Sequence, residues 1–173
     1  ACDFTTTGLT EKAKAMIGDA KWYLGGTSNY DSSSNGLASH FYKYERGTGV
    51  YSGRSTSWTG KVGLMYPSDY GYATSGGTTT NRASCLAKEI FNWDNSSVSD
   101  CKNNDWMYDS SLWQWTISPR ADNSYIVVSV YYAGYVSGNG AAFNGAARPV
   151  VHLKSTIKVI TGLGTKESPY SLE

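Results

Sequence analysis

The chain has 173 residues and a mass of 18.8 kDa, which suits a single domain. Its 15 Lys and Arg nearly balance its 14 Asp and Glu, and a net charge of +1 is too small for electrostatic binding of nucleic acid or an anionic membrane. Charged residues are scarce at 17%, whereas aromatic residues reach 14%, with 14 Tyr and 6 Trp. This composition favours a β-rich protein outside the cytoplasm and argues against a helical bundle or a disordered tail.

The first element predicted is a helix from Thr10 to Leu24, with Thr10 as its N-cap and an apolar stripe along one side. Gly25 and Gly26 are expected to end it. Residues 27–60 lack a clear period, and the glycine-punctuated stretches 41–47 and 50–53 read as short strand pieces.

A strand is predicted from Lys61 to Tyr66, where Pro67 closes it. A second helix is predicted from Ser84 to Trp93, and a polar loop follows from Asp94 to Asp105.

Strands dominate the rest of the chain, and they are predicted at Trp113–Ile117, Tyr125–Tyr132, Arg148–Lys154 and Thr156–Ile160. The elements do not alternate between strand and helix, so a doubly wound parallel sheet is disfavoured. We therefore expect an α+β fold with a twisted antiparallel sheet, two helices and long irregular loops.

Cysteine usage agrees with an oxidising compartment. Cys85 and Cys101 stand 16 positions apart in a polar stretch, and we predict a disulfide between them. Two free thiols in a cytosolic protein are the disfavoured alternative. Cys2 has no predicted partner in this sequence. The alternatives are a free thiol, a partner outside this sequence, or a position close to a trimming point. No Cys/His cluster indicates zinc.

No apolar run approaches the roughly 20 residues that span a bilayer, and no signal peptide is visible. We expect a processed ectodomain, located on a cell surface, on a phage particle or otherwise outside the cell.

Several short motifs carry a resemblance. They are WYLGG (22–26), GKVGLMYPSDYGY (60–72), NDW (104–106), WTISP (115–119), GYV (134–136), GAARPVVHLK (145–154), GLGT (162–165) and SPY (168–170). In these motifs most of the chain resembles surface or pilin-like proteins of gut Firmicutes and their mobile elements. It is also similar to the C-type-lectin-fold variable proteins of diversity-generating retroelements. Two departures are Ala146-Ala147, where such proteins often have Gly-Val, and Leu163, where Asp is usual.

The resemblance implies a single C-type-lectin-like domain over residues 1–173, with a displayed variable segment at about 115–148. In such proteins the retroelement changes template adenines, so that Asn codons scatter into Asn, Ser, Tyr, Asp, Ala, Gly and Phe. Residues 121–144 are dense in these types. The implied function is ligand binding by a displayed surface.

Along Tyr125–Tyr132 side chains alternate between two faces. Ile126, Val128, Val130 and Tyr132 form the more apolar set and are expected to face the core. The other set is expected to point outward, where tyrosine suits recognition because its large amphipathic ring has few torsions to restrict. A sheet face simply covered by tyrosines is a comparably weighted alternative. The predicted ligand-binding residues are Asn123, Tyr125, Ser129, Tyr131, Tyr135, Asn139, Phe143 and Asn144.

We therefore predict a surface display protein of the adhesin or receptor-binding type. Its expected partner is a protein or glycan on another cell or host surface, without nucleic acid, and the chain is expected to be monomeric or pilus-associated. A pilin-like structural subunit is the main alternative.

A cysteine hydrolase, which would need a free thiol beside His40 or His152, is a more distant alternative. We predict no enzyme activity and no cofactor. Oxygen-bearing side chains between Asp94 and Asp105 suggest calcium only weakly, and a solvated loop is favoured, so no metal site is predicted.

Overall fold

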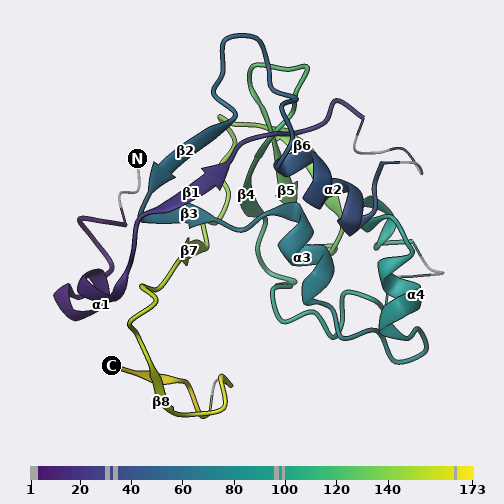
Figure 1. Ribbon diagram of the computed structural model, residues 1–173. Helices are drawn as coiled ribbons and strands as arrows, with labels where there is room; N and C mark the ends of the chain where they lie inside the picture. The colour runs from purple at the N-terminus through teal and green to yellow at the C-terminus, as the bar shows by residue number, and fades with distance from the viewer. Residues whose placement is uncertain (1–3, 30–31, 33–34, 96–97, 99, 166) are drawn as a thin grey trace. The chain divides into compact units, whose positions relative to one another are not determined.

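Figure 1 shows the ribbon of a computed structural model of the chain. The structure describes residues 4–29, 32, 35–95, 98, 100–165 and 167–173. The chain forms two compact units. The first unit comprises Ala1–Lys21, Thr59–Gly63 and Pro149–Glu173, and the second comprises Trp22–Trp58 and Leu64–Arg148. The expected α+β class is confirmed, whereas the single C-type-lectin-like domain stays a prediction.

The helices of the described chain are α1 (Glu11–Met16), α2 (Ala38–Glu45), α3 (Pro67–Ala73), α4 (Arg82–Leu86) and the 3-10 helix η1 (Ile90–Asn92). The strands are β1 (Ala20–Tyr23), β2 (Ser57–Gly60), β3 (Val62–Leu64), β4 (Gln114–Pro119), β5 (Ile126–Val130), β6 (Val136–Gly140), β7 (Pro149–Val151), β8 (Val159–Thr161) and β9 (Ser171–Leu172). A three-stranded sheet has the order β4-β5-β6, and two-stranded sheets pair β1 with β2, β3 with β7, and β8 with β9.

The first helix is shorter than the predicted one. Thr10 caps it as expected, since its Oγ1 accepts the N–H of Ala13 at 3.2 Å. The helix ends at Met16, because Gly18 disfavours helix and the following residues pair as β1. The predicted continuation to Leu24 is wrong.

Residues 41–47 were expected to be extended, but 41–45 are helical. In α2 the buried residues Ala38, Phe41 and Glu45 are spaced three and four apart, which is the helical period. The aromatic residues between them suggested β structure, and the helical spacing of the buried positions decided the outcome.

Pro67 begins α3 instead of merely closing a strand. Proline is tolerated in the first helical turn, where its missing N–H would have no partner. Helices α2 and α3 approach closely at Gly71, where an added Cβ would lie 2.6 Å from the Cβ of Ala38.

The second predicted helix is split into two pieces. Asn81, and not Ser84, is the N-cap of α4, and its Oδ1 accepts the N–H of Ser84 at 2.9 Å. The helix stops at Leu86, and a 3-10 turn follows at Ile90. The predicted disulfide between Cys85 and Cys101 is confirmed. Cys2 lies outside the described residues.

Sheet β4-β5-β6 has one face in the core of its unit. Thr116, Val128, Val130 and Val136 are buried on this face, and the hydroxyl of Tyr70 from α3 donates to the Gly134 carbonyl at 2.7 Å. Strand β6 was not predicted, because its glycines suggested a loop.

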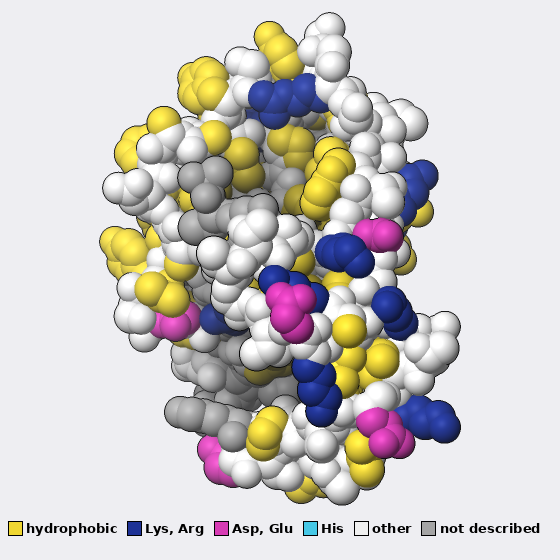
Figure 2. Space-filling model, turned by 90° about the vertical axis from the view of Figure 1, so that its left-hand side faces the viewer, with side chains coloured by type: hydrophobic (Ala, Val, Ile, Leu, Met, Phe, Trp, Pro, Cys, Tyr) yellow, Lys and Arg dark blue, Asp and Glu magenta, His cyan; other side chains and the backbone are white. Residues whose placement is uncertain are grey.

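No helix within the described ranges is both long and apolar enough to cross a bilayer. Figure 2 shows a view in which Lys and Arg side chains lie among acidic and hydrophobic ones.

Candidate functional site

The outer face of sheet β4-β5-β6 is built by strand register. Trp115 of β4 lies opposite Ser129 of β5, and Ser129 lies opposite Ser137 of β6. Side chains two residues away share this face. The buried set on the other face fixes the orientation, so that this face carries the aromatic side chains away from the core.

Five rings gather here, and we call them the aromatic cluster: Trp113, Trp115, Tyr131, Tyr135 and Phe143. Trp113 is central, with its ring centroid 5.0 Å from that of Trp115, 5.7 Å from that of Tyr131 and 5.9 Å from that of Phe143. Tyr131 and Tyr135 stack at 4.8 Å with an interplanar angle of 17°. Such contacts hold the rings in fixed orientations.

The cluster is accessible from outside the core. Phe143 is 63% exposed, and the other four rings are half-buried. Tyr132 was expected to face inward, but it is 59% exposed, because β5 ends at Val130 and the alternation of faces ends with it.

Amide and hydroxyl groups support the cluster. The Asn139 Nδ2 donates to Ser129 Oγ at 3.0 Å, and the Tyr131 hydroxyl donates to Asn139 Oδ1 at 3.4 Å. Ser129 is fully buried and also donates to the Ser137 carbonyl. It was expected to be exposed on the outward face, but it lies on that face and is buried, opposite Trp115 on β4 and beneath the amide of Asn139, which donates to its hydroxyl. Ser129 supports the face without being able to touch a ligand.

The remaining predicted site residues have different places. Tyr125 is 62% exposed, and its ring and that of Phe143 both lie near Gly140. Asn123 uses its Oδ1 to accept the N–H groups of Tyr125 and Ile126, and so it caps the turn before β5. Asn144 is exposed.

Trp113 and Trp115 were predicted as strand residues, but their role in this surface was missed. Their i, i+2 spacing already indicated one shared face. The segment that carries Phe143 is held against these two residues by backbone hydrogen bonds. The backbone N–H of Trp115 donates to the Ala146 carbonyl, and the backbone N–H of Ala146 donates to the Trp113 carbonyl. Gly145 permits this approach, since an added Cβ would lie 2.8 Å from Trp115 Nε1.

Two apolar hollows continue this surface. One, of about 360 Å³, is lined by Leu64, Trp115, Thr116, Ile117, Val127 and Ala141. The other, of about 320 Å³, is lined by Leu24, Arg54, Ser55, Ile117, Pro119 and Val127. Both include Ile117 and Val127, so they adjoin beside the aromatic cluster.

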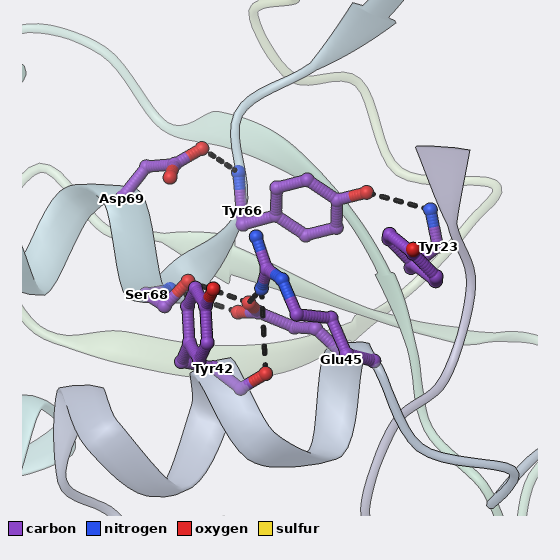
Figure 3. Close-up of polar contacts among 7 residues, drawn as sticks. Tyr23, Tyr42, Glu45, Tyr66, Ser68 and Asp69 are labelled. Atoms are coloured by element: carbon purple, nitrogen blue, oxygen red, sulfur yellow. Dashed lines mark hydrogen bonds and ion pairs between the residues drawn. The ribbon is translucent and has the colours of Figure 1, made fainter. Parts of the chain in front are cut away.

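The second polar feature of this unit is the buried carboxylate of Glu45 (Figure 3). Its oxygens accept the Ser68 N–H at 2.9 Å and the Ser68 hydroxyl at 2.5 Å, and they pair with Arg46 at 3.0 Å. Burial raises the pKa of Glu45 to about 7, although the Ser68 hydrogen bonds and Arg46 act in the opposite direction.

This network joins the end of α2 to the start of α3. The Arg46 guanidinium lies 3.6 Å from the ring centroid of Tyr42, and the Tyr66 hydroxyl accepts the backbone N–H of Tyr23 at 2.7 Å. Glu45 and Ser68 are 1% and 0% exposed, so a substrate cannot reach them. We interpret the network as structural.

Asp105 is a second buried acid. Its Oδ1 accepts the Met107 N–H at 2.8 Å, and burial raises its pKa to about 7 while Met107 and Arg148 act in the opposite direction. Like Glu45, it is enclosed, at 5% exposed.

Neither Cys85 nor Cys101 has a free thiol, because both sulfurs are in the disulfide. Within the part of the chain that is described, no three His, Cys, Asp or Glu side chains are placed to hold a metal ion. Of the oxygen-rich segment weighed for calcium, Asp100 accepts hydrogen bonds from Thr79 and Thr80.

Comparisons with models of protein families, with curated proteins and with solved structures each found no match.

Proposed function

We propose that this chain is a ligand-binding display protein of the adhesin or receptor-binding type, and that the aromatic cluster is its binding surface. The observation that carries the proposal is the accessible aromatic face of β4-β5-β6, which lies over a core face of buried small and β-branched residues. Four of the predicted site residues meet there, namely Tyr131, Tyr135, Asn139 and Phe143.

The physical reason is preorganisation. Large rings held by a sheet and by one another lose little conformational entropy when a ligand binds, and they offer both apolar area and hydroxyl groups. On a surface of this kind, the side chains that contact the ligand can differ between variants of the protein while the backbone stays the same.

The finer assignment follows the resemblance. We propose a C-type-lectin-like fold, an extracellular location on a cell or phage surface, and diversification of residues 115–148 by a retroelement. The disulfide supports the location. A near-copy of the DNA segment for residues 115–148, differing only at adenines and lying beside a reverse transcriptase gene, would support diversification. Neighbouring DNA without such a copy would count against it.

Binding of labelled protein to a panel of intact bacterial and epithelial cells tests the proposed function. A Tyr131→Ser, Phe143→Ser double variant is expected to lose binding, whereas Tyr72→Ser, which changes an exposed tyrosine of α3, is expected to retain it. Equal binding by both variants would show that the aromatic cluster is not the site.

A pilin-like subunit is the second candidate. Hairpin β8-β9 leaves Val159, Ile160, Leu163 and Tyr170 exposed, which is typical of a surface that serves assembly. Concentration-dependent self-association in sedimentation, abolished by Ile160→Lys, would favour it. A monomer at all concentrations would count against it.

A further inference from the structure

The two stretches of chain that carry the aromatic cluster contain no charged residue. Residues 123–147 contain no Asp, Glu, Lys, Arg or His, and neither do residues 110–119. All three strands of the sheet, the turn between β5 and β6, and the segment that carries Phe143 come from these two stretches.

Basic side chains at the borders are held by acceptors of the protein. Arg54 donates to the Ser124 carbonyl and Lys102 to the Ala133 carbonyl. Arg120 pairs with Asp122 at 2.7 Å, and Arg148 donates to the Met107 carbonyl at 2.9 Å. Asp94 is the acid near the cluster, and with Tyr131 it adds to the effect of burial in raising the pKa of Tyr135.

The groups offered to a ligand are therefore ring faces and hydroxyls. Tyrosine and serine hydroxyls both donate and accept hydrogen bonds. Ring faces bury apolar C–H surface. A partner that matches both has apolar faces, carries many hydroxyls and needs no counter-charge.

The surface is also elongated. From Trp113 to Pro119 the chain covers roughly 20 Å at strand spacing, and the two hollows adjoin along Ile117 and Val127. This is enough for a chain of several sugar rings, and more than a single sugar would cover.

We propose that the ligand of this surface is an uncharged polysaccharide chain, bound without calcium by stacking of sugar rings on the aromatic cluster and in the adjoining hollows. This inference rests on the proposed function and narrows it to one class of ligand. A peptide without charged side chains is the competing occupant. Its backbone N–H and C=O groups could pair with the same hydroxyls, so binding of such a peptide is a separate outcome of the test.

The test is affinity electrophoresis of the purified full chain through gels that contain neutral polysaccharides, namely mannan, galactomannan, xylan and mixed-linkage glucan. Polygalacturonate gels and titration with a proline-rich peptide serve as comparisons. At least one neutral polysaccharide is expected to retard the protein, with little difference between low and high salt because no ion pair is involved. Added EDTA is expected to have no effect.

Phe143→Ser is expected to weaken this binding by about tenfold or more. The exposed ring can be removed with little disturbance of the core, and Tyr131→Ser gives an independent second variant. Tyr72→Ser is the matched control and is expected to bind like the original chain. Cooperative thermal unfolding of each variant checks that it is folded.

Retardation only by polygalacturonate, binding only of the peptide, or loss of binding in EDTA would each overturn the inference. So would failure of every neutral polysaccharide while the cells of the earlier assay are still bound through the aromatic cluster. That last result would leave the proposed function standing. Cell binding that is unaffected by the cluster variants would instead overturn the proposed function itself.

Discussion

Glu45 shows how one buried side chain links two helices that the sequence did not predict. The carboxylate accepts two hydrogen bonds from Ser68 at the start of α3, and it also pairs with Arg46. Burial nevertheless outweighs these contacts and raises its pKa from 4.5 to about 7. The site therefore favours the protonated acid over the carboxylate.

This shift predicts how stability depends on pH. Between pH 4.5 and 7 the folded chain keeps a proton on Glu45 that the unfolded chain has lost, so the free energy of unfolding falls as pH rises. The loss attributable to Glu45 is on the order of 3 kcal/mol. Asp105, whose pKa is also raised to about 7, adds a slope of the same sign.

Urea unfolding at a series of pH values measures this slope. Glu45→Gln is expected to remove about half of it, because the amide cannot ionise and Asp105 still can. The exposed Glu167→Gln is the control. The same slope in Glu45→Gln and the original chain would contradict the assignment.

Gly145 allows a close approach at the residue scale. An added Cβ would lie 2.8 Å from Nε1 and 3.1 Å from Cδ1 of Trp115, so the indole must move. Gly145→Ala is expected to lower the free energy of unfolding by about 1–3 kcal/mol and to change the near-UV circular dichroism of tryptophan. Gly140→Ala is the control, because its new Cβ would lie 3.4 Å from the nearest atom, Cδ2 of Phe143. Equal effects of the two substitutions would argue against the tight contact.

At the scale of elements, the disulfide closes a polar segment behind α4. Near it, the Asp100 carboxylate accepts hydrogen bonds from Thr79 and Thr80, and the Thr74 hydroxyl donates to the Cys101 carbonyl. The cross-link therefore closes a loop that combines these polar contacts with the buried side chains of Ile90, Trp93 and Val98.

Replacing both cysteines by serine is expected to lower the free energy of unfolding by about 3 kcal/mol, because the unfolded chain gains the freedom of a 16-residue loop. Urea unfolding checks this, and the original chain in reductant should approach the variant. Unchanged stability in both cases would show that the cross-link contributes nothing.

Sequence patterns predicted some elements and not others for identifiable reasons. Alternation along Tyr125–Tyr132 predicted β5 and its buried face, because a period of two has few other interpretations. The aromatic content of residues 41–45 concealed α2, whose helical character lies in its buried spacing. The stripe beyond Met16 was misleading because pairing with a distant strand, which no local pattern records, decided the structure.

The candidate site also has features that the sequence indicates and features that it does not. Tyr131, Tyr135, Asn139 and Phe143 stand close together in the sequence, and they also lie together in the structure. The central place of Trp113 and the burial of Ser129 depend on register between three strands. That register follows from tertiary packing and could not be derived from local composition.

At the scale of the whole molecule, the proposed function requires the aromatic cluster to contact the surface of the partner. Other exposed aromatic and apolar side chains exist, among them Tyr72 on α3 and Tyr170 beside β9. They provide internal references for any measurement of contact.

Hydroxyl-radical footprinting of the protein, free and bound to the cells that it recognises, is the most direct measurement. We expect oxidation of Tyr131, Tyr135 and Phe143 to fall on binding, while oxidation of Tyr72 and Tyr170 stays the same. Protection of Tyr170 and its hairpin, with the three cluster residues labelled as in the free protein, would contradict the account.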